Sequence, residues 1–127
     1  MISSGDRTGG LIGDNSSSTI SNSTATGNVT ATARTNVGGL VGYNSSGAIS
    51  GTTSASGNVI GGNNTGGLVG YNSSSTITSA RASGTVSGTS YVGGLVGQNL
   101  TSSAISTSSA SGNVTGTSGR VGGTYWR

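Results

Sequence analysis

One eight-residue stretch recurs four times along this chain and begins a fifth time. In its second occurrence, at residues 37–44, the sequence is VGGLVGYN, and the incomplete fifth occurrence starts at Val121. The leucines at the centre of the four complete copies are 29, 28 and 27 residues apart, and they are Leu11, Leu40, Leu68 and Leu95. A period of this length is typical of repeat proteins, in which each repeat is one supersecondary unit. The sequence therefore predicts a single repeat domain over residues 1–127.

Each repeat also carries an isoleucine, an alanine and a valine at regular positions after the leucine. The isoleucine follows the leucine by nine residues in three repeats and by ten in the fourth, and the valine always follows the alanine by four. These columns are Ile20, Ile49, Ile77 and Ile105; Ala25, Ala55, Ala82 and Ala110; and Val29, Val59, Val86 and Val114. Spacing that is constant within segments and varies between them is typical of strands joined by turns.

The segments between the turns have the pattern of β-strands. In residues 24–30 (TATGNVT), Ala25, Gly27 and Val29 alternate with threonine and asparagine, which is the period of two that a strand requires. Glycine, threonine and valine also disfavour a helix there. Because one coil cannot bury its own row of apolar residues, the coils must stack, with each strand parallel to the same strand of the next coil.

The predicted fold is therefore an all-β parallel β-solenoid (β-helix) of about four to five coils, with about 28 residues in each coil. The coils are expected at about 8–36, 37–64, 65–91 and 92–120, with partial coils at 1–7 and 121–127. At ~4.8 Å per coil, the stack would be about 20 Å tall. The 26 glycines are expected at tight corners or close backbone approaches rather than in a phosphate-binding loop, because the chain contains no lysine.

An asparagine column accompanies the leucines. Each of these asparagines follows the leucine of its repeat by four residues, and they are Asn15, Asn44, Asn72 and Asn99. We expect an internal ladder, in which the side-chain amides satisfy backbone groups at a turn and stack along the solenoid axis. A ligand site built from the same column is the alternative.

The composition argues against several classes of function. With no His, Glu, Lys or Cys, the only carboxylates are Asp6 and Asp14, and no side chain is present to activate a serine. The sequence therefore predicts no catalytic residues, no cofactor and no metal. A net charge of +3 from five scattered arginines is too dilute for a nucleic-acid interface. No apolar run approaches the ~20 residues of a membrane-spanning segment.

The two ends of the chain are expected to take part in self-association. Ile2 lies seven residues before the first Gly-Gly pair, as Val59 does before Gly66, so the chain begins within a repeat, which suggests a piece of something longer. The first residues lack the basic and apolar regions of a signal peptide. Tyr125 and Trp126 replace the repeat pattern, and they are expected either to cover the last coil or to dock on the first coil of another copy. Such axial stacking would propagate as a filament.

The outward positions around the alanine and valine columns suggest a second function. They would form a flat, uncharged grid of the kind that binds ice, although any solvated β-face with few charges has a similar composition. The grid comprises Thr26, Asn28, Thr30, Ser56, Asn58, Ile60, Ser83, Thr85, Ser87, Ser111, Asn113 and Thr115.

The repeat as a whole resembles a known family. The GGL[VI]G core, followed by Asn, then by Ile with Ser or Thr, and then by the A-x-G-[NT]-V segment, is similar to the GLUG repeat of large bacterial surface proteins, including filamentous-haemagglutinin-like adhesins. The resemblance covers nearly the whole chain, and it implies a β-helical stalk on an exported protein, extracellular or at the cell surface, with a host or cell-surface ligand. Asp14 and Gln98 depart from the tyrosine found at Tyr43 and Tyr71, and this departure bears only on an aromatic stack.

Two functional hypotheses follow from these patterns. The first is a non-enzymatic structural module of an extracellular bacterial surface protein, which acts as an adhesin stalk or associates end to end into filaments. The second is an ice-binding protein that uses the Ser/Thr/Asn grid.

Overall fold

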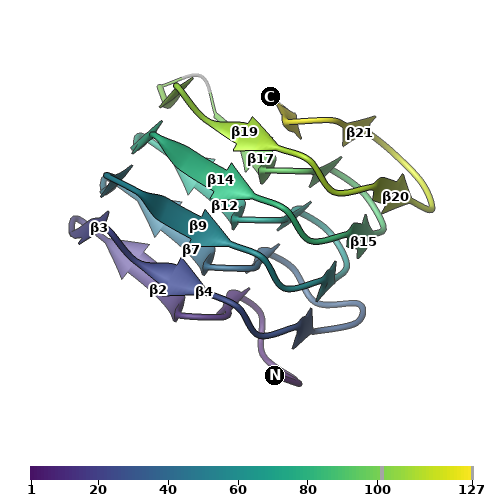
Figure 1. Ribbon diagram of the computed structural model, residues 1–127. Helices are drawn as coiled ribbons and strands as arrows, with labels where there is room; N and C mark the ends of the chain where they lie inside the picture. Colours follow the sequence, from purple (N-terminus) through teal and green to yellow (C-terminus); the bar gives the residue numbers. More distant parts are fainter. Residues whose placement is uncertain (101, 127) are drawn as a thin grey trace.

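The computed structural model is a parallel β-solenoid, in which strands of successive coils lie side by side along one axis (Figure 1). It describes residues 1–100 and 102–126. The two termini lie at opposite ends of the stack (Figure 1). The predicted all-β fold and its repeat of about 28 residues are therefore confirmed.

Each coil contributes one strand to each of five parallel sheets, which are named here after their first-coil strands. The β1 sheet contains β1 (Thr8–Gly9), β6 (Val37–Gly38), β11 (Thr65–Gly66), β16 (Val92–Gly93) and β21 (Val121–Gly122). The β2 sheet contains β2 (Ile12–Ser16), β7 (Val41–Ser45), β12 (Val69–Ser73), β17 (Val96–Asn99) and β22 (Tyr125–Trp126).

Three further sheets complete the circuit of each coil. The β3 sheet contains β3 (Thr19–Ser21), β8 (Ala48–Ser50), β13 (Thr76–Thr78) and β18 (Ala104–Ser106). The β4 sheet contains β4 (Thr24–Ala25), β9 (Thr53–Ala55), β14 (Ala80–Ala82) and β19 (Ser109–Ala110). The β5 sheet contains β5 (Val29–Thr30), β10 (Val59–Ile60), β15 (Val86–Gly88) and β20 (Val114–Gly116).

The pairing register matches the columns of the sequence. Ile77 pairs with Ile49 on one side and with Ile105 on the other, and Val59 pairs with Val29 and Val86 in the same way. Because side chains alternate between the two faces of a strand, a shift of one residue would turn every column outward. Identical residues in successive coils therefore hold the coils in register.

The interior is apolar and narrow, and it is best covered in the middle of the stack. Leu40, Leu68 and Leu95 are fully buried. The expected burial of Leu11 is wrong, because Leu11 is 49% exposed. It lies on the first coil, and no further strand pairs with the free edges of β1 and β2 at the N-terminal end of the stack. For the same reason, Ile105 and Val114 on the last complete coil are only partly buried.

The Gly-Gly pairs occur where the chain closely approaches both the backbone of the next coil and the alanine on the opposite side of its own coil. A Cβ atom on Gly67 would lie 2.1 Å from the carbonyl oxygen of Gly94 in the next coil and 3.0 Å from the Cβ of Ala82. A Cβ atom on Gly39 would meet Gly67 and Ala55 in the same way. These glycines therefore serve close backbone approach, and the alanine column packs against the glycine column.

The corners of the coils use left-handed backbone at residues other than glycine. One corner, just before the β1 sheet, has φ of 60°, 55°, 52° and 51° at Arg7, Asn36, Asn64 and Tyr91. Asparagine tolerates this region better than most residues, whereas tyrosine and arginine do not. The Asn64 Nδ2 atom also donates to Asn36 Oδ1 at 2.9 Å. Stacking between coils therefore stabilises corners that local sequence alone does not favour.

Candidate functional site

The asparagine column forms a buried, continuous ladder of amides along the β2 sheet. This asparagine ladder consists of Asn15, Asn44, Asn72 and Asn99, and each of the four is buried. The Nδ2 atoms of Asn15, Asn44 and Asn72 each donate to the Oδ1 atom of the asparagine in the next coil, at distances of 2.7, 2.8 and 2.8 Å in chain order. Asn44 and Asn72 therefore act as both donor and acceptor, whereas Asn15 only donates and Asn99 only accepts within the ladder, which is the internal ladder that the sequence suggested.

Backbone carbonyls complete the hydrogen bonding of the ladder. The Nδ2 atom of Asn15 also donates to the carbonyl of Ser18 at 2.9 Å, and the Nδ2 atom of Asn72 donates to that of Ser75 at 3.4 Å. The ladder has a direction, because all its amides donate toward the C-terminal end of the stack. No group in the described part of the chain donates to the Oδ1 atom of Asn15, which lies at the N-terminal end.

A second column, on the outer side of the β2 sheet, contains stacked aromatic rings. The ring centroids of Tyr43 and Tyr71 are 5.1 Å apart and the ring planes differ by 6°. The departure at Asp14 does not leave the stack open, because the guanidinium of Arg7 lies 4.3 Å from the Tyr43 centroid and forms an ion pair with Asp14. Burial, together with the neighbouring Tyr43, raises the pKa of Tyr71 above its ordinary value.

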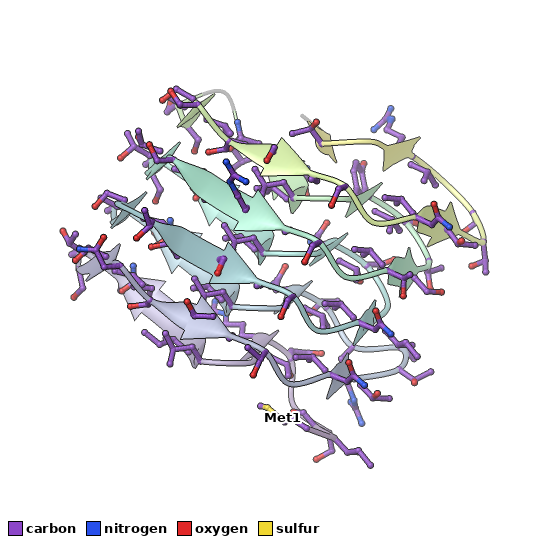
Figure 2. All side chains as sticks on the ribbon, viewed as in Figure 1. Met1 is labelled. Carbon is purple, nitrogen blue, oxygen red and sulfur yellow. The ribbon has the colours of Figure 1, made fainter. Side chains whose placement is uncertain are left out.

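The exposed edges at the two ends of the stack differ from the sequence-based expectation. Ile2 does not continue the valine column, because it pairs with Thr30, which is an outward-facing position. Ile2 is consequently 89% exposed. Met1 lies beyond the first coil (Figure 2), and its carbonyl oxygen accepts the amide of Thr30 at 2.8 Å. The valine-to-glycine spacing misled the prediction, because this loop varies in length between coils.

The two ends of the chain are also only partly complementary. Residues 1–3 add one strand position to the β5 sheet, while β21 and β22 extend the β1 and β2 sheets. A coil shared between two stacked copies would therefore lack strands in the β3 and β4 sheets. The predicted contacts of the Tyr125 and Trp126 side chains lie outside the described side chains; their backbone pairs with β17.

The Ser/Thr/Asn grid does not form one flat face. Only one of its three columns, Thr30, Ile60, Ser87 and Thr115, lies in a sheet, the β5 sheet. The other two columns lie in the connection between the β4 and β5 sheets, where the backbone bends at a glycine in every coil. The side chain of Asn28 is engaged within the stack, because its Oδ1 atom accepts the amide of Asn58 at 2.9 Å. Asn58 accepts the amide of Thr85 in the same way. The expectation of a flat grid is thus wrong, and the physical reason is the bend.

The carboxylates of the chain lie on the surface and have local partners. Asp6 accepts the backbone amide of Thr35 at 3.1 Å, and Asp14 pairs with Arg7 and accepts the hydroxyl of Ser16. Within residues 1–100 and 102–126, no pocket and no cluster of metal-ligating side chains is found. The same residues contain no helix that is long and apolar enough to cross a membrane.

Comparison with known families agrees with the repeat seen in the coils. The family described as "The GLUG motif" matches at residues 4–30, 61–87 and 88–115, which together make up more than half of the chain. The chain belongs to the GLUG motif family. No curated protein and no solved structure matches it significantly. The coil at 37–64 lies mostly between the matched segments, yet it stacks in the same register as the other GLUG coils.

Several structural residues of the GLUG coil were not singled out by the sequence analysis. The residue after each of the three buried leucines is also buried, although neighbours in a strand point to opposite faces, because the chain turns a corner at the leucine. These residues are Val41, Val69 and Val96. The start of the β1 sheet adds another buried column, Thr8, Val37, Thr65 and Val92. Their constant spacing from the leucine was the available signal.

Proposed function

We propose that this chain is a non-enzymatic structural module, a rigid β-solenoid stalk of an extracellular bacterial surface protein. The observation that supports it best is the register. Interior coils pair with both neighbours through the same columns, and one asparagine ladder runs through all of them. A coil of this kind can be repeated without any change in its contacts, so stalk length is set by coil number.

The polar outer surface fits such a role. The outward positions of the β3 and β4 sheets are mostly serine and threonine, and the described ion pair Arg7–Asp14 is local. Chemistry of this kind suits a spacer, whose function is to hold another part of a protein at a distance. A host or cell-surface ligand and an extracellular location are parts of this proposal, supported by membership of the GLUG family and by its resemblance to adhesin repeats.

Insertion of one whole coil tests the proposal. A second copy of residues 65–91 placed after Tyr91 keeps the register of every sheet and adds one asparagine to the ladder. We expect a folded protein whose length, measured by small-angle X-ray scattering, increases by ~4.8 Å. The matched control inserts a second copy of residues 65–77 only, which adds half a coil and breaks the register. An unfolded full-coil variant, or one of unchanged length, would overturn the proposal.

End-to-end association is the second way in which such a module can act. At the N-terminal end of the stack, β1, β2, β3 and β4 each have an unpaired edge, and Leu11 is half exposed. Both features favour association. We favour the stalk, because the pairing between coils of one chain is enough to support it. Light scattering and negative-stain images across a concentration series separate the two, because a protein that is monomeric at high concentration excludes filaments.

The ice-binding alternative remains a proposal of lower rank, because the bend separates the columns of its grid. A thermal-hysteresis assay tests it. Activity that disappears when Thr85 is replaced by a bulky charged residue would favour ice binding over the stalk.

A further inference from the structure

Tyr43 and Tyr71 are register partners on β7 and β12, two neighbouring parallel strands. Parallel strands in register place equivalent side chains ~4.8 Å apart, so two tyrosines at one position stack face to face. The observed separation of 5.1 Å and angle of 6° agree with this arrangement. Both rings are partly exposed, so a small oxidant in solution reaches them.

The residues before and after this pair in the column are not aromatic, so the tyrosine stack has two members. The position before Tyr43 is Asp14 and the position after Tyr71 is Gln98, so the described column holds two adjacent phenols. Tyr91 has a different environment, since its hydroxyl accepts a hydrogen bond from Arg120 at 2.9 Å, and the Arg120 guanidinium lies over its ring. Tyr91 is therefore an internal control for a tyrosine that does not stack on another tyrosine ring.

We propose that Tyr43 and Tyr71 form an oxidative cross-linking site, at which a dityrosine bond joins two neighbouring coils. Each phenol loses one electron and its phenolic proton and becomes a neutral tyrosyl radical. The two radicals couple through one Cε carbon of each ring, which forms a single C–C bond. The hydrogen on each coupled carbon then moves to the phenolic oxygen and restores aromaticity. The two electrons and two protons reduce one hydrogen peroxide to two waters, with a haem peroxidase as catalyst.

The fold favours this coupling within one molecule. Backbone pairing fixes both Cα atoms in adjacent strands, so only rotation of the side chains is needed to bring two Cε carbons together. Holding reactants in contact replaces a bimolecular encounter with a unimolecular step and raises the effective concentration by orders of magnitude. At low protein concentration, the bond within one chain therefore forms faster than a bond between chains.

The product is a covalent link between the second and third coils on the outside of the β2 sheet. It closes a loop of one coil, so the linked chain has less freedom when unfolded. We therefore expect the oxidised protein to unfold at a higher denaturant concentration than the untreated protein. The cross-link would strengthen a stalk, but its formation does not depend on that role.

The arginines of the chain make the test simple. Tryptic cleavage after Arg34 and Arg81 leaves Tyr43 and Tyr71 together in residues 35–81, while Tyr91 lies in residues 82–120. The dilute folded chain is treated with hydrogen peroxide and a haem peroxidase, and the digest is analysed by mass spectrometry and dityrosine fluorescence. We expect residues 35–81 to lose the mass of two hydrogens, with no backbone fragments between the two tyrosines. We expect residues 82–120 to keep their mass.

Two variants and a denatured sample complete the experiment. Tyr43→Phe and Tyr71→Phe retain a stacked ring but lack one phenol, so each should abolish the mass loss and the fluorescence while the circular dichroism spectrum stays unchanged. Oxidation in denaturant should reduce the yield of the internal link at least tenfold. The proposal is overturned if the folded protein gives chiefly linked dimers or links to Tyr91, or if the denatured chain gives the same yield.

Discussion

Replacement of Asn72 by alanine removes the central link of the asparagine ladder. In the folded protein, Asn72 Oδ1 accepts from Asn44 Nδ2 at 2.8 Å and Asn72 Nδ2 donates to Asn99 Oδ1 at 2.8 Å. Both partners are fully buried, so the substitution leaves one donor and one acceptor without a partner. Each such buried group costs about 1–3 kcal/mol, which gives a loss of about 4 kcal/mol in the free energy of unfolding.

The matched control is Asn99→Ala, at the C-terminal end of the same ladder. There only Asn72 loses a ladder partner, and its Nδ2 atom keeps the carbonyl of Ser75. The expected loss is about 1 kcal/mol. The double variant Asn44→Ala/Asn72→Ala should cost less than the sum of the single variants, because each removes a partner that the other leaves unsatisfied. Urea unfolding followed by circular dichroism measures the wild type, the three single variants Asn44→Ala, Asn72→Ala and Asn99→Ala, and the double variant. Equal losses for Asn72→Ala and Asn99→Ala would refute the ladder as a stabilising element.

Three further predictions concern packing of the leucine column, the close contacts of Gly67, and pH. Leu68→Ala should reduce the free energy of unfolding by about 3 kcal/mol, whereas Leu11→Ala, at a half-exposed position of the same column, should cost less than about 1 kcal/mol in the same urea assay. Gly67→Ala should cost at least about 3 kcal/mol in that assay, since its Cβ would lie 2.1 Å from a backbone oxygen, whereas Gly27→Ala, whose Cβ meets no atom within 4 Å, should cost far less. The raised pKa of Tyr71 means that the fold binds its phenolic proton more tightly than the unfolded chain does. Its contribution to stability is therefore complete below the ordinary tyrosine pKa of ~10 and is lost as the pH rises through the folded pKa, so thermal unfolding scans above pH ~10 should show a steeper decline for the wild type than for Tyr71→Phe.

The interior of the fold was predictable because the spacing of the sequence repeat determines the register between neighbouring coils. Once Leu40 and Leu68 occupy the same column, parallel pairing places every intervening residue of one coil beside its equivalent in the next. The asparagine ladder follows from the same argument, since a polar residue at a constant position in a narrow stack is satisfied by its own copies. The fold class and the ladder therefore needed no information beyond periodicity.

Periodicity alone does not predict the structure at the ends of the stack or at the bends within each coil. Leu11 follows the same Thr-Gly-Gly sequence as Leu68. It has a coil on one side only, so its exposure depends on its position in the stack. Ile2 pairs with Thr30 and does not continue the valine column, because the loop that precedes the β1 sheet varies in length between coils. The bend at Gly27 preserves the alternation of Ala25 and Val29, so the pattern that predicted a strand could not distinguish a flat grid from a folded one. Arg7 stacks on Tyr43 through a contact between different repeats, which no single repeat specifies.

The central claim is that equivalent residues of successive coils are direct neighbours in space. Nuclear Overhauser contacts between the side-chain amide protons of Asn72 and those of Asn44 and Asn99 test it most directly. These residues are 28 and 27 positions away in the sequence, and hydrogen bonds of 2.8 Å join them. The account predicts strong contacts from Asn72 to both neighbours, together with slow exchange of the amide protons. Absence of these contacts, with close Hα–Hα contacts between consecutive strands such as β12 and β13, would show an antiparallel arrangement and would contradict the solenoid.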